Sequence, residues 1–184
     1  NTTAEPIDDH GHGTAMGSLI DDIAPGAQLI AVKALDSSGN GYESDIIAGL
    51  EYCGQQNVSI ISLSIGEGAY PGYCVDNLVA KEVDTLTASG VLVIAATGND
   101  GSTTNIKSPA CSATALPVTA SDENDTIASL ANYNSGVALT APGVDVPAKS
   151  ITGTDIIISG TSASTAIVTG ISALIMQGNT EFSA

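Results

Sequence analysis

The sequence has no arginine, no tryptophan and only one phenylalanine. Its four basic residues are all lysines and stand against 20 aspartates and glutamates, which gives a formal net charge of −16 at pH 7. So negative a chain repels the phosphate backbone of nucleic acids and anionic membrane surfaces. We therefore expect no nucleic-acid partner. An acidic composition is common among secreted proteins, but by itself it does not identify a function.

Long apolar runs and paired-cysteine motifs are also missing. The longest apolar stretch, at residues 58–65, has the length of a strand and is far shorter than the roughly 20 residues that span a bilayer. We expect no transmembrane segment. None of Cys53, Cys74 and Cys111 lies in a CxxC pair, which argues against a zinc site and allows one disulfide with one spare thiol.

The chain does contain an alternation of short apolar runs and amphipathic stretches. Four runs rich in Val, Ile and Ala are bounded by Gly, Asn or Pro, which is typical of buried parallel strands. Apolar residues at helical spacing mark the stretches between them. We expect strands at residues 28–35, 58–65, 91–97 and 116–121, and helices at residues 43–56 and 75–89.

This alternation predicts an α/β fold, a three-layer αβα sandwich with a mainly parallel sheet. No shift in composition divides the chain, so we expect one domain over residues 1–184. A last apolar helix should begin near Thr161, run through Ile175 and be buried on most sides. Ligands bind at the carboxyl ends of the strands in such sheets. Polar, glycine-rich loops follow the strand ends at residues 36–41, 64–68 and 97–101.

The two histidines, His10 and His12, lie close together, so any imidazole base must come from this segment. The alternative to a catalytic base is that this segment is a metal-binding or solvated acidic turn. Residues 13–19 favour the base, because they start a helix that would hold the ring of His12 at its first turn.

Two further segments have both a structural and a chemical interpretation. Ser162 lies at or near the start of the last helix, where serine is a common N-cap but where a nucleophile would also face the positive end of the helix dipole. Asn99 lies in a Gly-Asn-Asp-Gly stretch, which is good turn chemistry on its own. Neither signal is specific alone.

Five motifs nevertheless occur in a single order along the chain. They are HGT at residues 12–14, SLSIG at 62–66, AATGNDG at 95–101, LTAPGVDV at 139–146 and GTSAST at 160–165. With this order and spacing, the sequence from Asp8 to Met176 resembles the subtilisin-like serine proteases, peptidase family S8. The resemblance implies the subtilisin-like sandwich and a peptidase that acts on polypeptide substrates without a cofactor.

The resemblance also assigns roles to residues. The base falls on His12, the nucleophile on Ser162 and the oxyanion-hole amide on Asn99, which would act with the backbone N–H of Ser162. An extended substrate would pair with two segments by β-augmentation. These segments are Gly39, Asn40 and Gly41 on one side, and Ser64, Ile65 and Gly66 on the other. The primary specificity pocket would lie between the second segment and Ala96, Thr97 and Gly98.

The chain departs from the family pattern at both ends. Only eleven residues precede His12, and Asp8 and Asp9 are too near it in sequence to be the family's triad aspartate. The family usually continues past the nucleophile helix as well. We therefore expect a partial core that lacks the first strand and C-terminal elements, whose aspartate lies upstream and which alone is inactive or very weak. The alternative is a catalytically inactive module with a structural or binding role in an extracellular assembly.

The resemblance further implies a disulfide between Cys74 and Cys111, with Cys53 in the core. The family's calcium loop behind the histidine helix is absent at residues 21–26, so we expect no metal there. The acidic turn at residues 122–125 is either a weak structural calcium site or a solvated turn.

Glu67, beside the expected specificity pocket, would favour substrates with a basic residue immediately before the cleaved bond. We expect a secreted or cell-surface protein, to which the sequons at Asn1, Asn57 and Asn124 lend weak support. A signal peptide was either removed or never belonged to this sequence, since no basic and apolar leader is present. The protein's own propeptide and flanking domains are further candidate partners.

Overall fold

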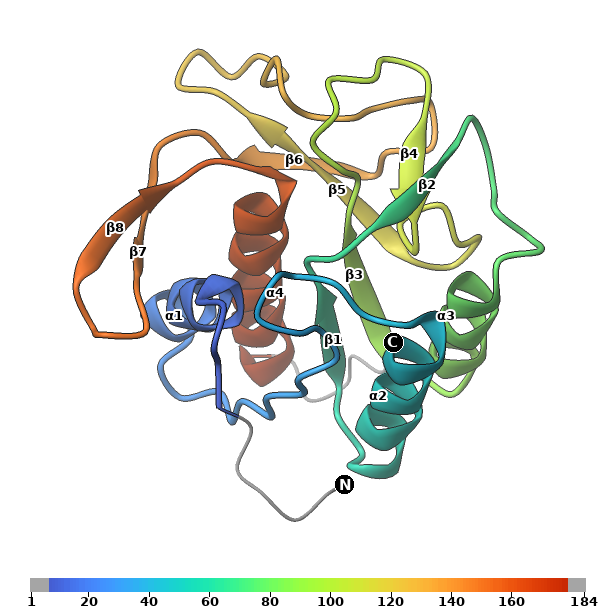
Figure 1. Ribbon diagram of the computed structural model, residues 1–184, viewed down its shortest axis with the longest axis horizontal. Coiled ribbons are helices and arrows are strands. Elements are labelled where there is room, and N and C mark those ends of the chain that lie inside the picture. The colour runs from blue at the N-terminus through green and yellow to red at the C-terminus, as the bar shows by residue number, and fades with distance from the viewer. Residues whose placement is uncertain (1–6, 179–184) are drawn as a thin grey trace.

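The centre of the molecule is a four-stranded parallel sheet (Figure 1). The computed structural model describes residues 7–178. The strands stand in the order β1 (Ile60–Leu63), β3 (Leu92–Ala96), β5 (Leu116–Ser121) and β6 (Leu139–Pro142). All three neighbouring pairs are parallel, and Leu63 lies opposite Ala95 where β1 and β3 end. Three of these strands confirm the runs expected at residues 58–65, 91–97 and 116–121.

Helices cover both faces of this sheet (Figure 1). On one face α4 (Thr161–Gly178) packs on the strands, and α1 (His12–Ile23) lies against α4. On the other face lie α3 (Leu78–Ala88) and, next to it, α2 (Glu43–Gln55). The helices expected at residues 43–56 and 75–89 are therefore confirmed, as is the α/β sandwich.

The alternation of side chains along β3 explains why both faces need a cover. Val93 packs with Val83 of α3, whereas the next residue, Ile94, packs with Val168 of α4. All these side chains except Val168 are fully buried, and Val168 is nearly so. A strand that is apolar on both faces is stable only between two layers.

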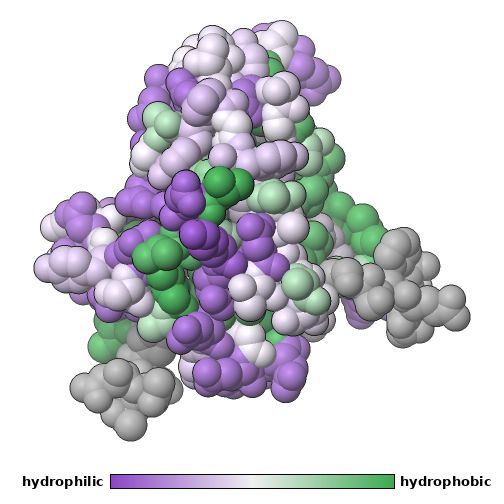
Figure 2. All heavy atoms as spheres, turned by 90° about the vertical axis from the view of Figure 1, so that its right-hand side faces the viewer, coloured by the Kyte–Doolittle hydropathy of each residue, from purple (hydrophilic) through white to green (hydrophobic). Residues whose placement is uncertain are grey.

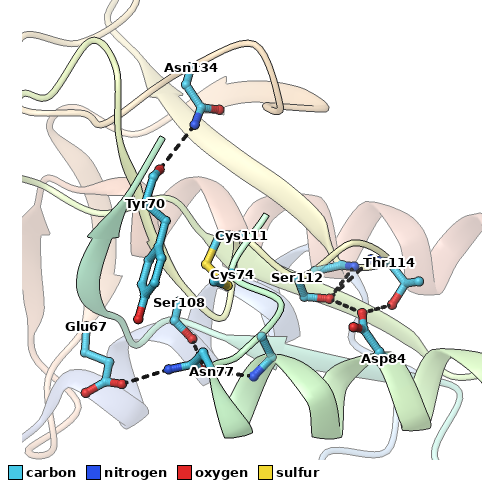
Figure 3. The surroundings of a disulfide bond; sticks show 12 residues. Glu67, Tyr70, Cys74, Asn77, Asp84, Ser108, Cys111, Ser112, Thr114 and Asn134 are labelled. Carbon is cyan, nitrogen blue, oxygen red and sulfur yellow. Dashed lines mark hydrogen bonds between the residues drawn. A yellow bond between two sulfur atoms is a disulfide. The ribbon is translucent and has the colours of Figure 1, made fainter. Parts of the chain in front are cut away.

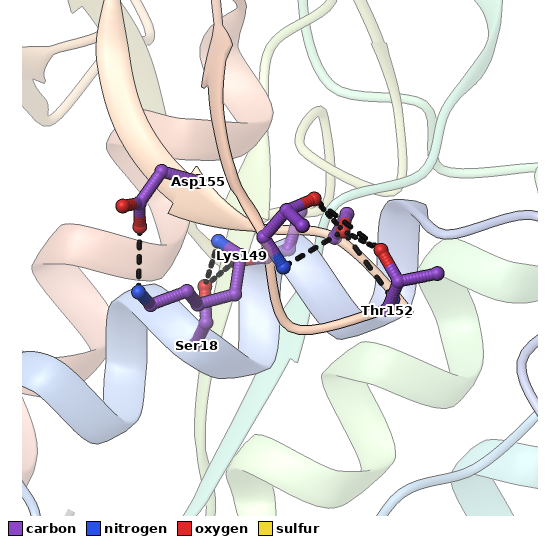
Figure 4. A network of polar contacts seen from close by, with 7 residues as sticks. Ser18, Lys149, Thr152 and Asp155 are labelled. Atoms are coloured by element: carbon purple, nitrogen blue, oxygen red, sulfur yellow. Dashed lines mark hydrogen bonds and ion pairs between the residues drawn. The ribbon is translucent and has the colours of Figure 1, made fainter.

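Two small antiparallel pairs flank the central sheet, and the sequence patterns did not predict them. One joins β2 (Glu67–Tyr70) to β4 (Ile106–Ser108), and the other joins β7 (Val146–Lys149) to β8 (Asp155–Ile158). The second hairpin is fastened to α1 (Figure 4). The N–H of Lys149 donates to the hydroxyl of Ser18 at 3.0 Å, and the ammonium of Lys149 holds Asp155 at 2.5 Å.

The strand expected at residues 28–35 was a wrong prediction. The segment forms no strand, and Leu29, Ile30 and Val32 remain 48%, 41% and 38% exposed. A strand is defined by hydrogen bonds to a neighbour, and within residues 7–178 no strand pairs with this segment.

The burial expected for the last helix is correct only for its first half. The buried residues of α4 all lie between Thr161 and Gly170, whereas Ile171 and Leu174 are 46% and 44% exposed. As a whole, α4 packs on all four strands of the central sheet and on α1 (Figure 1). No helix within residues 7–178 is both long and apolar enough to cross a membrane.

Candidate active site

His12 is the first residue of α1, where the chain turns sharply into the helix. The preceding Gly11 has φ 94°, in the left-handed region that favours glycine. The carboxylate of Asp8 accepts hydrogen bonds from the N–H of Gly11 at 2.7 Å and from the N–H and hydroxyl of Thr14 at 2.8 and 2.6 Å. These bonds, the Thr14 hydroxyl first, hold the pKa of Asp8 well below its usual range. Asp8 therefore closes the first turn of the helix, as an N-terminal cap does.

The surroundings of the His12 ring favour its neutral form. Burial is the first cause of its lowered pKa, and the second is the nearby His10, whose ring centroid lies 6.3 Å away. The charge of Asp8 opposes these effects only in part. Within the described part of the chain, the ring of His12 makes no hydrogen bond to a carboxylate. A neutral imidazole is the form that can accept a proton.

Asn99 follows β3, and its side chain is oriented by the start of α4. The amide oxygen of Asn99 accepts from the backbone N–H of Thr161 at 2.8 Å and from the Thr161 hydroxyl at 2.9 Å. The same hydroxyl accepts from the N–H of Gly98 at 3.2 Å. Because both bonds to the side chain use its oxygen, the amide NH₂ is the end that remains for a ligand.

Asn132 holds the loop that carries Asn99, and no sequence motif pointed to it. The residue is 2% exposed. Its amide oxygen accepts from the N–H groups of Asp100 and Ser102 at 2.9 and 3.0 Å, while its NH₂ donates to the carboxylate of Asp100 at 3.0 Å. Its backbone carbonyl accepts from the hydroxyls of Thr97 and Thr119. The loop is therefore fixed on several sides.

Ser162 is the second residue of α4, so its backbone N–H has no partner within the helix and faces outward from the positive end of the dipole. Its hydroxyl lies 3.5 Å from the carbonyl oxygen of Ser64, at the limit of a hydrogen bond. In return, the hydroxyl of Ser64 donates to the carbonyl of Ser162 at 3.2 Å. The start of α4 is thus joined to the end of β1.

One cavity of about 480 Å³ brings His12, Asn99 and Ser162 together. His10 and the apolar side chain of Ile156 in β8 also line it. Within residues 7–178 no hydrogen bond joins the hydroxyl of Ser162 to the ring of His12. The three segments that sequence motifs identified therefore meet at one cavity, in which the His12 ring is not hydrogen-bonded to the Ser162 hydroxyl.

The segments expected to bind substrate lie close to this cavity. Gly39 has φ 77°, and a Cβ at this residue would lie 3.3 Å from Nε2 of His10. Gly41 approaches the chain so closely that a Cβ would lie 2.4 Å from the carbonyl oxygen of Ala34. Asn40 and the segment at residues 64–66 belong to no strand, and Ala96 closes β3. The backbone of Asn40 is already bonded, because its N–H donates to the carboxylate of Asp36 at 3.0 Å and its carbonyl accepts from the N–H of Asp36 at 2.7 Å. An added peptide strand would have to replace these bonds at Asn40.

The expected disulfide between Cys74 and Cys111 is confirmed, with a Cα–Cα distance of 5.4 Å (Figure 3). Cys53 is free and half-buried. In the same region the carboxylate of Glu67 accepts from the amide of Asn77 at 3.1 Å. Asn77 is the N-cap of α3, so Glu67 is directed toward that helix.

Several acidic side chains of the described residues have hydrogen-bond partners in the turns that carry them, as Asp122 illustrates. Among residues 7–178, no group of three or more His, Cys, Asp or Glu could hold a metal ion. In the acidic turn at residues 122–125, the carboxylate of Asp122 accepts from the N–H of Asn124 and from the N–H and hydroxyl of Thr126. Its oxygens therefore close the turn itself.

The family model described as the subtilase family (Peptidase_S8) matches residues 1–184. M-protease from Shouchella clausii (strain KSM-K16) is 37% identical over 185 residues, covering 96% of this chain and 47% of that protein. Subtilisin Savinase from Lederbergia lenta is also 37% identical, over 96% of this chain and 66% of its own. The chain thus spans about half to two thirds of the length of these relatives.

Solved structures agree with these sequence matches. A cold-adapted subtilisin-like serine proteinase superposes with a TM-score of 0.88 at 28% identity, covering 98% of this chain and 66% of that one. The prenylagaramide maturation protease PagA gives a TM-score of 0.83 at 29% identity, over 96% and 68% of the two chains.

Proposed function

Because the chain belongs to the subtilase family, we propose that it is the core of a serine endopeptidase that cleaves polypeptides through an acyl-enzyme. One observation carries this proposal. Thr161 fixes the amide oxygen of Asn99, so that the NH₂ of Asn99 is available in the cavity that Ser162 and His12 also line. A donor fixed in advance beside a serine suits the stabilisation of an oxyanion.

In the proposed reaction, the hydroxyl oxygen of Ser162 attacks the carbonyl carbon of the scissile peptide bond while His12 takes the hydroxyl proton. The NH₂ of Asn99 and the N–H of Ser162 donate to the oxyanion that forms. His12 then returns the proton to the leaving amine, which departs and leaves an ester on Ser162. Water, deprotonated by His12, hydrolyses this ester and regenerates the serine.

The resemblance to the family also calls for a carboxylate that orients the imidazole. Asp8 is occupied by the first turn of α1, and Asp9 lies 2.5 Å from the ammonium of Lys33. We propose that an aspartate outside the 184 residues supplies this group. The loss of such an aspartate lowers turnover by about 10⁴-fold in serine proteases, so the chain alone should be nearly inactive.

A second candidate function is that of a binding module without catalysis. The observation that favours it is the state of His12, which within residues 7–178 is bonded neither to Ser162 nor to a carboxylate. On this alternative the cleft would hold an extended peptide without cutting it.

For location, we propose that the protein is secreted or displayed outside the cell. The support is the disulfide between Cys74 and Cys111, since such bonds persist mainly in oxidising compartments.

A fluorophosphonate probe separates the two functions. We expect the complete gene product to be labelled at Ser162, as located by peptide mass mapping, and the 184-residue chain to be labelled little or not at all. Ser162→Ala should abolish labelling. If the folded complete product shows no labelling, the binding module becomes the better account.

The Asn99→Ala variant of the complete product tests the oxyanion role. It should retain its fold and its binding of peptides, but its kcat should fall by about 10²–10³-fold, the effect of removing such a donor in subtilisin. An unchanged kcat would remove Asn99 from the mechanism.

A further inference from the structure

Lys107 stands between the two segments expected to form the walls of the primary specificity pocket. It is the middle residue of β4, and its backbone N–H donates to the carbonyl of Thr97 at 2.9 Å. Thr97 belongs to one wall, at residues 96–98. The other wall, at residues 64–66, leads directly into β2, which pairs with β4. The side chain of Lys107 therefore begins where both walls meet.

Two glycines show where the methylene groups of Lys107, the stem of its side chain, lie. A Cβ at Gly66 would lie 2.9 Å from the Cβ of Lys107, and a Cβ at Gly98 would lie 2.9 Å from its Cγ and 3.0 Å from its Cδ. These distances are shorter than ordinary van der Waals contacts between carbons. The methylene groups of this one side chain therefore lie against both walls and leave no room for a Cβ at either glycine.

The far end of the side chain is anchored as well. The ammonium of Lys107 lies 3.1 Å from the carboxylate of Asp100, which is itself bonded to the buried Asn132. Hydrogen bonds from Asn132 and Lys107 lower the pKa of Asp100, so this carboxylate remains charged. The side chain of Lys107 is only 25% exposed. It is held by β4 at one end and by the ion pair at the other.

We propose that Lys107 closes the primary specificity pocket and restricts cleavage to bonds that follow glycine, alanine or serine. This inference rests on the proposed function and names its substrate class. A large side chain such as that of phenylalanine or leucine would have to displace the stem of Lys107 and break its ion pair with Asp100. A small side chain ends before it reaches the stem.

Charged residues before the cut are also disfavoured. A basic substrate side chain is repelled by the ammonium of Lys107. An acidic substrate side chain gains little from that ammonium, because it is already paired with Asp100 and the chain has a net charge of −16. The basic preference expected from Glu67 is not supported by these contacts, because Glu67 bonds to Asn77 instead.

The test is a series of succinyl-Ala-Ala-Pro-X p-nitroanilides, with X as Ala, Leu, Phe, Glu or Lys, hydrolysed by the complete gene product. We expect kcat/KM to be at least about 10-fold higher for Ala than for Phe. In Lys107→Ala, the ratio of Phe to Ala should rise by about 10-fold or more as the stem is removed. Preference of the parent enzyme for Phe, Glu or Lys, or an unchanged ratio in Lys107→Ala, would overturn the proposal.

Lys107→Met is the matched control, because methionine keeps an unbranched stem of similar length without the charge. If the methylene groups of residue 107 determine the selectivity, the ratio of kcat/KM for Phe to that for Ala should stay within about threefold of the parent value in this variant. A ratio that rises as far as in Lys107→Ala would assign selectivity to the charge and refute the role of the stem. Thermal unfolding of each variant verifies that β4 is intact.

Binding measurements separate this inference from the proposed catalysis. In the Ser162→Ala protein, calorimetry with peptides Ac-Ala-Ala-Pro-Ala and Ac-Ala-Ala-Pro-Phe should show tighter binding of the first, and adding Lys107→Ala should remove the difference. That result without any hydrolysis by the parent protein would keep Lys107 as the residue that closes the pocket and would end the catalytic proposal. If the parent protein hydrolyses peptides but shows no binding preference that depends on Lys107, the catalytic proposal stands and the role of Lys107 is refuted. Absence of both hydrolysis and binding would overturn both.

Discussion

At the residue scale, two asparagines have separate roles in the loop after β3. Asn99 presents its amide to the cavity because Thr161 holds its oxygen, and Asn132 fixes the backbone on which Asn99 stands. The first was recognised from its motif. The second was not, because its role arises only from contacts with residues some 30 positions away.

Replacing Asn132 with alanine should therefore affect both stability and activity. The change leaves the part-buried N–H groups of Asp100 and Ser102 without this acceptor, at a cost of about 1–3 kcal/mol for each group that water does not reach. We expect a lower midpoint in urea denaturation and a lower kcat on any cleaved peptide. Asn124→Ala, in an exposed turn, is the control and should change neither. Equal stability of the two variants would contradict this role of Asn132.

His12 should titrate below the ordinary histidine value of 6.5. Because the folded state favours neutral His12, this group does not change the free energy of unfolding well above pH 6.5. As the pH falls below 6.5, it lowers the free energy of unfolding. NMR titration of the ring Hε1 signal measures this pKa directly. His10→Gln removes the neighbouring positive charge and should raise the pKa of His12. No upward change in that variant would show that burial acts alone.

At the element scale, the disulfide ties the segment before α3 to the loop after β4. Cys74 and Cys111 are 37 residues apart, and in the chain-entropy model closing such a loop stabilises the folded state by about 4 kcal/mol. The double variant Cys74→Ser, Cys111→Ser should lose most of this stability in urea denaturation. Cys53→Ser, which removes the free thiol, should lose much less. A double variant as stable as the parent would contradict the prediction.

The sequence predicted well those elements that carry their own periodicity. The buried strands β1, β3 and β5 and the helices α2 and α3 lie within a few residues of their expected bounds. Residues 28–35 have the composition of a strand, but composition does not provide a neighbour to pair with. The short pairs β2–β4 and β7–β8 were missed because three- and four-residue strands are too short to show an alternation.

For the site, motifs identified His12, Asn99 and Ser162, and the structure brings them to one cavity. The contacts that orient these residues were not predictable in the same way. Thr161 lies in the GTSAST motif, but the motif assigned it no role, and Lys107 lies in no motif. Only the packing of α4 and β4 against the loop after β3 gives these two residues their partners.

At the scale of the whole molecule, negative charge is in large excess. All four lysines form ion pairs with aspartates: Lys33 with Asp9, Lys81 with Asp76, Lys107 with Asp100 and Lys149 with Asp155. Polar and apolar residues are interspersed on the face shown in Figure 2. The remaining acidic groups repel one another, and this repulsion opposes the compact state.

Sodium chloride should therefore stabilise the protein. Raising its concentration from about 10 mM to 0.5 M shortens the Debye length several-fold and screens this repulsion. We expect Tm at pH 7 to rise by about 2–4 °C for each kcal/mol of repulsion relieved. A fall in Tm would mean that the four ion pairs outweigh the repulsion. At pH 4, where many carboxyl groups are protonated, the effect of salt should be smaller.

The position of the site residues along the chain has a consequence for biosynthesis. His12 begins α1 and Ser162 lies in α4, so α1 leaves the ribosome well before α4. Contacts so distant in sequence carry a high entropic cost of loop closure and form late in folding. On the proposed mechanism, a nascent or half-folded copy has no assembled site with which to digest its neighbours.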